Sequence, residues 1–270
     1  MSQIFSYQPN FDQIAEELAV HGFSCISEVI VSEYVSNLSA VVYNQHYWYK
    51  ESDSFHGHNT FLVPNLINKS TYCLDLAFDD NILAIAKRFF LPGAYHDEKN
   101  VYQLHLMHGR VIEGQSPPQQ LHIDSRCCGI YPPSHLHFFL YLDDCVAAGD
   151  GATRFVPGSH RFLRYSRQED DSKAVEVHGK KGTLIVLNSA TYHGSSQKST
   201  IGTRGVLTFA FSRWFIRQPF SIPYFKSWPR ELTEQERYIL GFDNYGAIDD
   251  FSRISARGIL PDLIANPYNL

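Results

Sequence analysis

The feature that most constrains the fold is a change in sequence pattern near residue 100. Before it, apolar residues recur at helical spacing, and Gly or Pro ends the helical runs. After it, short runs rich in aromatic and branched residues alternate with Gly and Pro. These runs are residues 101–107, 136–142, 153–156, 174–178, 183–188 and 206–212. Short strands separated by frequent turn residues are typical of a β-sandwich or barrel.

The region before residue 100 predicts helices that flank this β region. The expected elements are helices near 11–20, 31–49 and 79–90, a strand at 23–30, a polar loop at 51–70, and a late helix at 233–240. We therefore expect a mainly β fold with flanking helices, of the jelly-roll, cupin-like type. It would form one domain over residues 1–270, with 1–100 as helical support, 101–215 as the jelly-roll core and 216–270 as a C-terminal lid or tail.

Composition excludes several classes of function. The net charge is −5 and the Lys and Arg residues are scattered, so no basic stripe for nucleic acid is present. The five cysteines form no CxxC pair, which argues against a disulfide framework or a structural zinc site. No basic and apolar leader begins the chain, and no apolar run reaches the roughly 18–20 residues of a membrane span. A soluble, cytoplasmic protein without a membrane partner is expected.

A first candidate metal-binding pair is His122 and Asp124. Residues two apart on a strand point to the same face, so an imidazole and a carboxylate at this spacing can bind one ion. The pattern alone is weak, because it arises often by chance. A rival pair at His96 and Glu98 lies in a charged run and predicts a solvated loop instead.

A third ligand would complete the two-His, one-carboxylate set typical of non-haem iron enzymes. The downstream candidates are His135, His137, His160, His178 and His193. His193 has the best context, because it follows an apolar strand and precedes a turn of small residues. His135 and His137 lie in an aromatic strand and are interpreted as structural, and His160 lies in a predicted turn.

Such a site leaves coordination positions for 2-oxoglutarate and O2, and the far carboxylate of 2-oxoglutarate then needs a cation. Arg204 lies eleven residues after His193, at the start of a predicted strand, and its planar fork suits a carboxylate. Ser195, two residues after His193, is placed to donate a hydrogen bond to the same group. The plain alternative for Arg204 is a surface arginine at a strand start.

Taken together and in order, these motifs resemble the phytanoyl-CoA dioxygenase family of Fe(II)/2-oxoglutarate oxygenases over about residues 11–242. The matching segments are QLHID at 120–124, LDD at 142–144, GATRFVPGSHR at 151–161, GTLIV at 182–186, HGS at 193–195, and Arg204. The Pro157-Gly158-Ser159-His160 run is the most specific single match.

The resemblance implies a double-stranded β-helix that binds Fe(II) through His122, Asp124 and His193. It implies 2-oxoglutarate binding by Arg204 and Ser195. It further places Phe139, and Gln103 or His105, beside the cosubstrate, and gives His160 a structural role in its turn. Asp124 argues against halogenation, because related halogenases lack this carboxylate. Arg126 is a candidate for contact with an anionic substrate, with a salt bridge at the pocket rim as the alternative.

The expected activity is hydroxylation, or another oxidation, of an unactivated C–H bond in a small metabolite of specialised metabolism. Desaturation, cyclisation and epoxidation stay open, and so do a monomer and a homodimer. A cupin-like metalloenzyme without 2-oxoglutarate and a small-molecule-binding jelly roll are the competing classes. The loops expected to cover the site are 51–70, 108–119 and 162–173, with the tail after 213.

Overall fold

A computed structural model of the chain describes residues 3–45, 49–50, 59–92, 101–125 and 133–242. Several sequence predictions lie outside these residues. They concern Arg126, the His96–Glu98 pair, Cys127 and Cys128, residues 51–58 of the predicted loop, and the tail after residue 242.

The largest element is a seven-stranded sheet with the order β1-β8-β5-β10-β4-β3-β2. Every neighbouring pair in it is antiparallel. Its strands are β1 (Phe23–Ile26), β2 (Tyr49–Lys50), β3 (Thr60–Val63), β4 (Tyr102–Glu113), β5 (His135–Tyr141), β8 (Leu184–Asn188) and β10 (Thr203–Arg213). The long strands β4 and β10 lie side by side, and β10 also pairs with β5.

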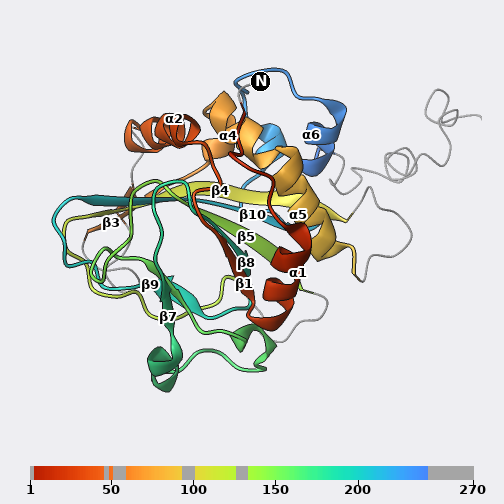
Figure 1. Ribbon diagram of the computed structural model, residues 1–270. Coiled ribbons are helices and arrows are strands. Elements are labelled where there is room, and N and C mark those ends of the chain that lie inside the picture. The colour runs from red at the N-terminus through yellow and green to blue at the C-terminus, as the bar shows by residue number, and fades with distance from the viewer. Residues whose placement is uncertain (1–2, 46–48, 51–58, 93–100, 126–132, 243–270) are drawn as a thin grey trace, which may run out of the picture.

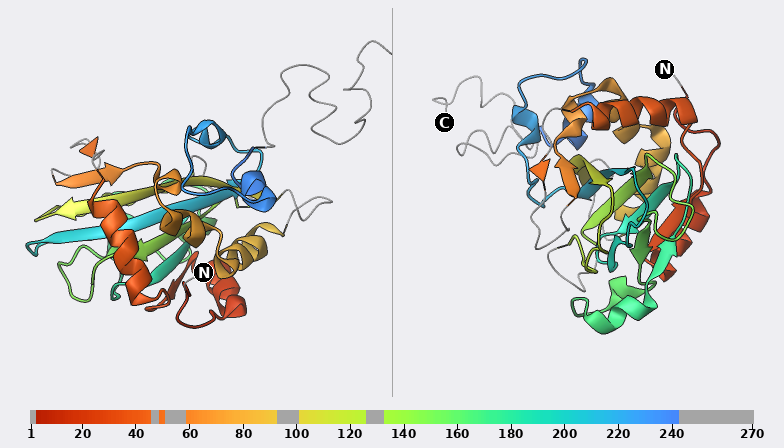
Figure 2. Two further views of the ribbon diagram at one scale, coloured as in Figure 1. Left: turned by 90° about the horizontal axis from the view of Figure 1, so that it is seen from above. Right: turned by 90° about the vertical axis from the view of Figure 1, so that its left-hand side faces the viewer.

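A second, three-stranded sheet has the order β7-β6-β9. It consists of β6 (Thr153–Phe155), β7 (Val175–Val177) and β9 (His193–Ser195). In Figure 1 the strands β7 and β9 lie on one side of the large sheet, and helices α1, α4 and α5 lie on the other side. The two further views in Figure 2 show the same separation of helices and small sheet. The predicted mainly β fold with flanking helices is thus confirmed.

The helices cover the outer face of the large sheet. They are α1 (Phe11–Val20), α2 (Ser32–Tyr43), α4 (Thr71–Ala77), α5 (Asp80–Phe90) and α6 (Glu234–Ile239), with the short 3-10 turns η1 (Leu66–Asn68) and η4 (Ile222–Tyr224). Two further 3-10 turns, η2 (Ser159–Arg161) and η3 (Gln168–Lys173), connect β6 to β7 of the small sheet. Asn10, Ser70, Asp79 and Thr233 cap four of these helices through side-chain oxygens.

The two largest of three apolar clusters among the described residues divide the core by face. The larger lies between the helices and the outer face of the large sheet, and includes Leu38, Ile85, Phe138 and Phe209. The smaller lies between the two sheets and includes Tyr141, Phe155 and Ile185. Strand β5 supplies both clusters, because alternate residues of a strand point to opposite faces.

The sequence placed most elements but missed or misjudged some. The loop predicted at 51–70 contains strand β3, and the loop predicted at 108–119 begins only after β4 ends at Glu113. The helix expected at 31–49 ends at Tyr43. Helix α4 was not predicted, because seven residues are too few to establish a helical period. Among the described residues, no helix combines the length and apolar content needed to cross a membrane.

Candidate metal centre

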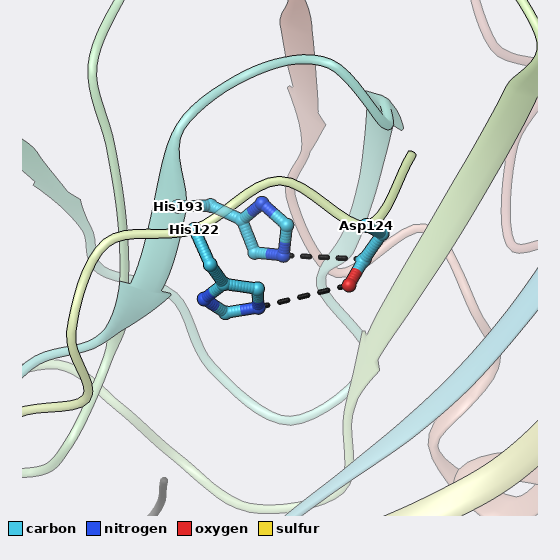
Figure 3. Close-up of side chains that lie close together, drawn as sticks. All are labelled: His122, Asp124 and His193. Atoms are coloured by element: carbon cyan, nitrogen blue, oxygen red, sulfur yellow. Dashed lines mark ion pairs between the residues drawn. The ribbon is translucent and has the colours of Figure 1, made fainter. Parts of the chain in front are cut away.

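The three residues expected to bind a metal come together at the edge of the small sheet. The ligand atoms of His122, Asp124 and His193 all lie within 4.8 Å of one another. Nε2 of His122 is 3.6 Å from Oδ1 of Asp124, and Nε2 of His193 is 3.2 Å from Oδ2 of Asp124. Figure 3 shows the two imidazoles and the carboxylate turned toward one another. His193 was one of five histidines considered, and it is the one that completes the group.

Backbone pairing brings the two histidines together. His122 donates its N–H to the carbonyl of His193 at 2.9 Å, and His193 returns the bond at 3.0 Å. The segment before His122 also lies against β9, where a Cβ on Gly194 would be 2.9 Å from the carbonyl oxygen of Gln119. A glycine at position 194 is therefore needed for this close approach.

Each histidine is oriented by its other ring nitrogen. Nδ1 of His122 lies 3.1 Å from the carbonyl of Gln120, and Nδ1 of His193 lies 2.9 Å from the carbonyl of Thr191. A carbonyl only accepts hydrogen bonds, so each Nδ1 carries the hydrogen and each Nε2 keeps its lone pair. These lone pairs are the ones directed toward Asp124, as metal binding requires.

The charge states also fit a divalent metal. Burial, with the neighbouring His193, lowers the pKa of His122 to about 4, so its imidazole is neutral near pH 7. At Asp124, burial acts to raise the pKa, but His137 and His193 lower the pKa well below the usual carboxyl range. Two imidazoles and one carboxylate are the donor set that suits Fe(II), so the residues present fit this metal.

The Pro157-Gly158-Ser159-His160 motif contacts the backbone next to His193. Gly158 adopts a left-handed φ of 77°, which favours glycine. The fully buried Ser159 hydroxyl accepts the N–H of Tyr192 at 2.8 Å and donates to the carbonyl of Val156 at 2.7 Å. The motif therefore fixes the backbone next to His193, and the His160 ring itself lies 3.2 Å from the Ala19 carbonyl, outside the metal-site cavity.

Arg204 lies in the same cavity as the three metal-site residues. Its side chain is buried, with 3% exposed, and donates to Thr153 Oγ1 at 3.0 Å. Its guanidinium also lies 5.4 Å from the ring centre of Tyr141. Within the described residues no carboxylate is in ion-pair contact with Arg204, and its Nε has no hydrogen-bond partner. The surface-arginine alternative is thus wrong.

The cavity has a volume of about 180 Å³ and lies between the two sheets. Ser195 and Phe139 line it, as the resemblance implied. Ser195 stands opposite Thr153 in the pairing of β6 with β9, which places both residues beside Arg204. Gln119 also lies beside Ser195, because its Oε1 accepts hydrogen bonds from Arg110 at 3.1 Å and from the Ser195 N–H at 3.3 Å.

The sequence interpretation of two histidines as purely structural was incomplete. His135 and His137 both line the cavity, and they alternate with the outward-facing Leu136 and Phe138 on β5. This spacing of two was visible in the sequence and is the signal that could have identified them. Thr153 and His108 also line the cavity. Thr153 lies within the matching segment 151–161, which had no role assigned to this residue, and His108 lies in no motif.

Gln103 does not fit its expected place beside the cosubstrate. Its buried side chain donates to the carbonyl of Ile216, and it is absent from the cavity lining. The chain that follows β10 folds back against the start of β4, where the Ile216 carbonyl accepts this bond. His105, the alternative to Gln103, does line the cavity. His178 pairs with Glu176 at 3.4 Å, away from the site.

Comparison with known proteins agrees with this geometry. The family model described as phytanoyl-CoA dioxygenase (PhyH) matches residues 19–206. The chain belongs to this family. The match includes His122, Asp124, His193 and Arg204, and it begins within helix α1.

Curated relatives are fungal dioxygenases. The chain is 26% identical to dioxygenase FUM3 of Gibberella moniliformis over 202 residues, which cover 70% of this chain and 65% of FUM3. It is 24% identical to dioxygenase himG of Aspergillus japonicus, covering 75% of this chain and 68% of himG. The match to FUM3 thus spans slightly less than two thirds of that relative.

Solved structures share the fold at low sequence identity. HygX from Streptomyces hygroscopicus, solved with nickel and 2-oxoglutarate, matches with a TM-score of 0.60 and 20% identity, over 76% of this chain and 88% of HygX. The alpha-ketoglutarate-dependent epimerase SnoN from nogalamycin biosynthesis matches with a TM-score of 0.65 and 18% identity, over 84% and 94%. The carbocyclase SnoK has a TM-score of 0.62, with 18% identity over 83% and 94%. These likenesses support the double-stranded β-helix fold.

Proposed function

We propose that this protein is an Fe(II)- and 2-oxoglutarate-dependent oxygenase that hydroxylates a C–H bond of a small metabolite. One observation carries the proposal. A His-Asp-His set and a buried arginine without a carboxylate partner among the described residues line one cavity of about 180 Å³. A metal site alone would not need the arginine, and a binding module would need neither.

In this proposal His122, Asp124 and His193 hold the iron. The neutral imidazoles and the carboxylate leave a net charge of +1 on the bound Fe(II) unit, which favours an anionic ligand in the open positions. When bound, iron and 2-oxoglutarate together would supply the activation of O2 for oxidation of the substrate. The chain contributes the fixed ligand directions described above and a cavity lined by residues of both sheets.

Arg204 gives the cavity its selectivity for a dicarboxylate. Burying a guanidinium without a counter-charge costs several kcal/mol, and this cost is offset when a carboxylate binds beside it. Thr153 orients the guanidinium, and Ser195 on the facing strand can add a hydroxyl donor. Phe139, opposite Thr208 in the pairing of β5 with β10, forms the apolar side of the proposed cosubstrate site.

Hydroxylation is the outcome that we propose within this class. Asp124 occupies the position that halogenases of this kind leave free of a carboxylate. The solved neighbours include an epimerase and a carbocyclase, so the fold itself supports several outcomes. The position of the substrate relative to the metal then decides the product.

A small metabolite is the proposed substrate class. The cavity volume of about 180 Å³ leaves little space beyond the cosubstrate, so only the reacting part of a larger substrate would enter it. Burial is the main cause that lowers the pKa of His108 to about 3 and of His135 to about 4. These two imidazoles, which lie beside the metal site, are therefore neutral near pH 7. Neutral imidazoles suit hydroxyl and carbonyl groups, which are common in the metabolites of specialised pathways.

The test is a panel of candidate metabolites incubated with Fe(II), 2-oxoglutarate and O2, read by succinate release and product mass. A gain of one oxygen atom that depends on 2-oxoglutarate would support hydroxylation. Loss of two hydrogens or a change of stereochemistry would retain the cosubstrate chemistry but overturn the hydroxylase assignment. Asp124→Ala serves as the control, since it should abolish succinate release while the chain stays folded.

A further inference from the structure

A third imidazole, that of His137, contacts the metal-site carboxylate from the large sheet. Nδ1 of His137 lies 2.5 Å from Oδ2 of Asp124, and the His137 side chain is 5% exposed. Among the described residues this nitrogen makes no hydrogen bond of good geometry, and its contact with Asp124 is a close ion pair. The polar group closest to this buried ring nitrogen is therefore a proposed metal ligand.

The distance distinguishes a hydrogen bond from shared metal ligation. Metal–ligand bonds of about 2.1 Å at right angles place two ligand atoms about 3.0 Å apart. The pair His193 Nε2 and Asp124 Oδ2, at 3.2 Å, fits this separation. The pair His137 Nδ1 and Asp124 Oδ2, at 2.5 Å, is too close for two ligands of one metal, and a nitrogen and a carboxylate oxygen this close need a hydrogen between them.

The two partners differ in how firmly the fold holds them. His137 lies in the middle of β5, between Ala210 of β10 and Leu187 of β8. Asp124 lies outside the strands, and its side chain is 29% exposed. A carboxylate on such a segment can rotate, and rotation changes which oxygen faces the two imidazoles. A donor on the central sheet removes that freedom.

We propose that His137 is a positioning residue for the metal centre. It donates from Nδ1 to one oxygen of Asp124 and holds the carboxylate in the orientation that faces His122 and His193. The metal is then bound through one carboxylate oxygen, and positions stay open for a chelating cosubstrate. This inference rests on the proposed function, because it assigns a role to a neighbour of the proposed ligands.

The test compares replacements that keep or remove the donor at this position. In His137→Asn the amide nitrogen takes the place of Nδ1, whereas His137→Phe keeps a ring and has no donor. The readout is the affinity of the metal-free protein for Co(II) and Mn(II), measured by calorimetry, together with the visible spectrum of the Co(II) form. Far-UV circular dichroism and the thermal midpoint without metal establish that each variant is folded.

We expect His137→Phe to weaken metal binding about 10- to 100-fold, as loss of a hydrogen bond to a ligand usually does. His137→Asn should stay within a few-fold of wild type. The Co(II) spectrum should change in His137→Phe, because a freed carboxylate alters the ligand arrangement, and should be retained in His137→Asn. If the ring variant does not fold, His137→Leu replaces it.

His135→Phe is the matched control. His135 lies on the same strand face, with its ring centre 6.4 Å from that of His137, and its Nδ1 is 2.9 Å from the Ser134 hydroxyl instead of the carboxylate. Its metal affinity should equal that of wild type. Equal metal affinity in wild type and His137→Phe would overturn the role of His137, and so would equal losses in His137→Asn and His137→Phe. Absence of metal binding in wild type would instead overturn the proposed function.

Discussion

The two faces of strand β5 show how this chain separates stability from chemistry. On the outer face, Leu136, Phe138 and Leu140 belong to the core beneath the helices. On the inner face, His135 and His137 line the metal-site cavity. Adjacent residues of one strand thus have opposite surroundings, because a strand turns alternate side chains to opposite sides.

The difference between the two faces predicts which property each kind of substitution should change. The outer face is a continuous apolar layer, in which the rings of Phe138 and Phe209 stack with centres 4.8 Å apart. The inner face has polar and ionisable groups that line the cavity, such as Arg204 and the metal-site residues. Changes on the outer face should lower stability, and changes on the inner face should lower ligand binding while the fold remains.

His122→Ala should have the largest effect on function. Removal of one of three proposed ligands should reduce metal affinity and succinate release by more than about 100-fold, beyond the loss expected from a neighbour of a ligand. The thermal midpoint of the metal-free protein should change little, because His122 lies outside the apolar clusters. Calorimetric metal titration measures the loss of affinity, and thermal unfolding measures the midpoint. A large drop in the midpoint would contradict the separation of stability and metal binding between the two faces.

Phe138→Ala should have the largest effect on stability. The side chain is fully buried, so its removal leaves a cavity and should reduce the free energy of unfolding by about 3–5 kcal/mol. Urea denaturation measures this loss. The fraction that stays folded should bind metal as wild type does, and a selective loss of metal binding would show that the two faces are not independent.

Arg204→Met should change the requirement for 2-oxoglutarate without changing the affinity for metal. Hydrogen bonds to a charged group contribute about 1.5–3 kcal/mol each, so half-saturation should rise roughly 10- to 100-fold. Arg204→Lys keeps a charge without the planar fork, so its half-saturation concentration should lie between those of wild type and Arg204→Met. Succinate release at increasing 2-oxoglutarate gives the comparison, and unchanged half-saturation in Arg204→Met would contradict the assignment.

Acid should destabilise the metal-free protein through its inner face. Burial is the main cause that lowers the pKa of His108 to about 3 and of His135 to about 4, from the ordinary 6.5. Between about pH 6.5 and pH 4 the unfolded chain then binds more protons than the folded chain, so stability falls as the pH falls. Urea midpoints at pH 7.5, 6 and 5 should show this slope. His135→Gln should reduce it, and an unchanged slope would exclude His135 as a contributor.

Ser195→Ala should have the smallest effect. Its hydroxyl is one proposed donor beside a guanidinium that already binds the carboxylate, and a neutral hydrogen bond contributes about 0.5–1.5 kcal/mol. The requirement for 2-oxoglutarate should therefore rise roughly two- to tenfold. Succinate release at increasing 2-oxoglutarate measures this half-saturation concentration. A larger rise in Ser195→Ala than in Arg204→Met would contradict the assignment of Arg204 as the main carboxylate-binding residue.

Local patterns predicted the fold class, and the resemblance to a known family selected the three residues that the structure brings together. The spacing of His122 and Asp124 is visible in the chain itself, but the turn expected after His193 is wrong, because His193–Ser195 forms strand β9. The position of the Gln103 side chain was not visible in the sequence, since it depends on how the chain after β10 folds back. The choice between Gln103 and His105 stayed open, because the pairing of β4 with β10 shifts register between Ala210 and Phe211, and bulges rarely have a sequence signal.

His137 illustrates a different kind of limit. Its alternation with Phe138 indicated an inward-facing side chain, but its contact with Asp124 joins residues from separate segments. No local pattern encodes that contact. Thr153 was likewise found only through its bond to Arg204 across the two sheets. Local periodicity gives the direction of a side chain, and tertiary packing gives its partner.

The most direct test of the central claim is the visible spectrum of the protein with Fe(II) and 2-oxoglutarate in the absence of O2. Chelation of iron by 2-oxoglutarate in the proposed site should give a charge-transfer band. The band should be absent in His122→Ala, and in Arg204→Met it should be lost at low 2-oxoglutarate and regained at high concentration. No band with folded wild-type protein, or an unchanged band in His122→Ala, would contradict the account.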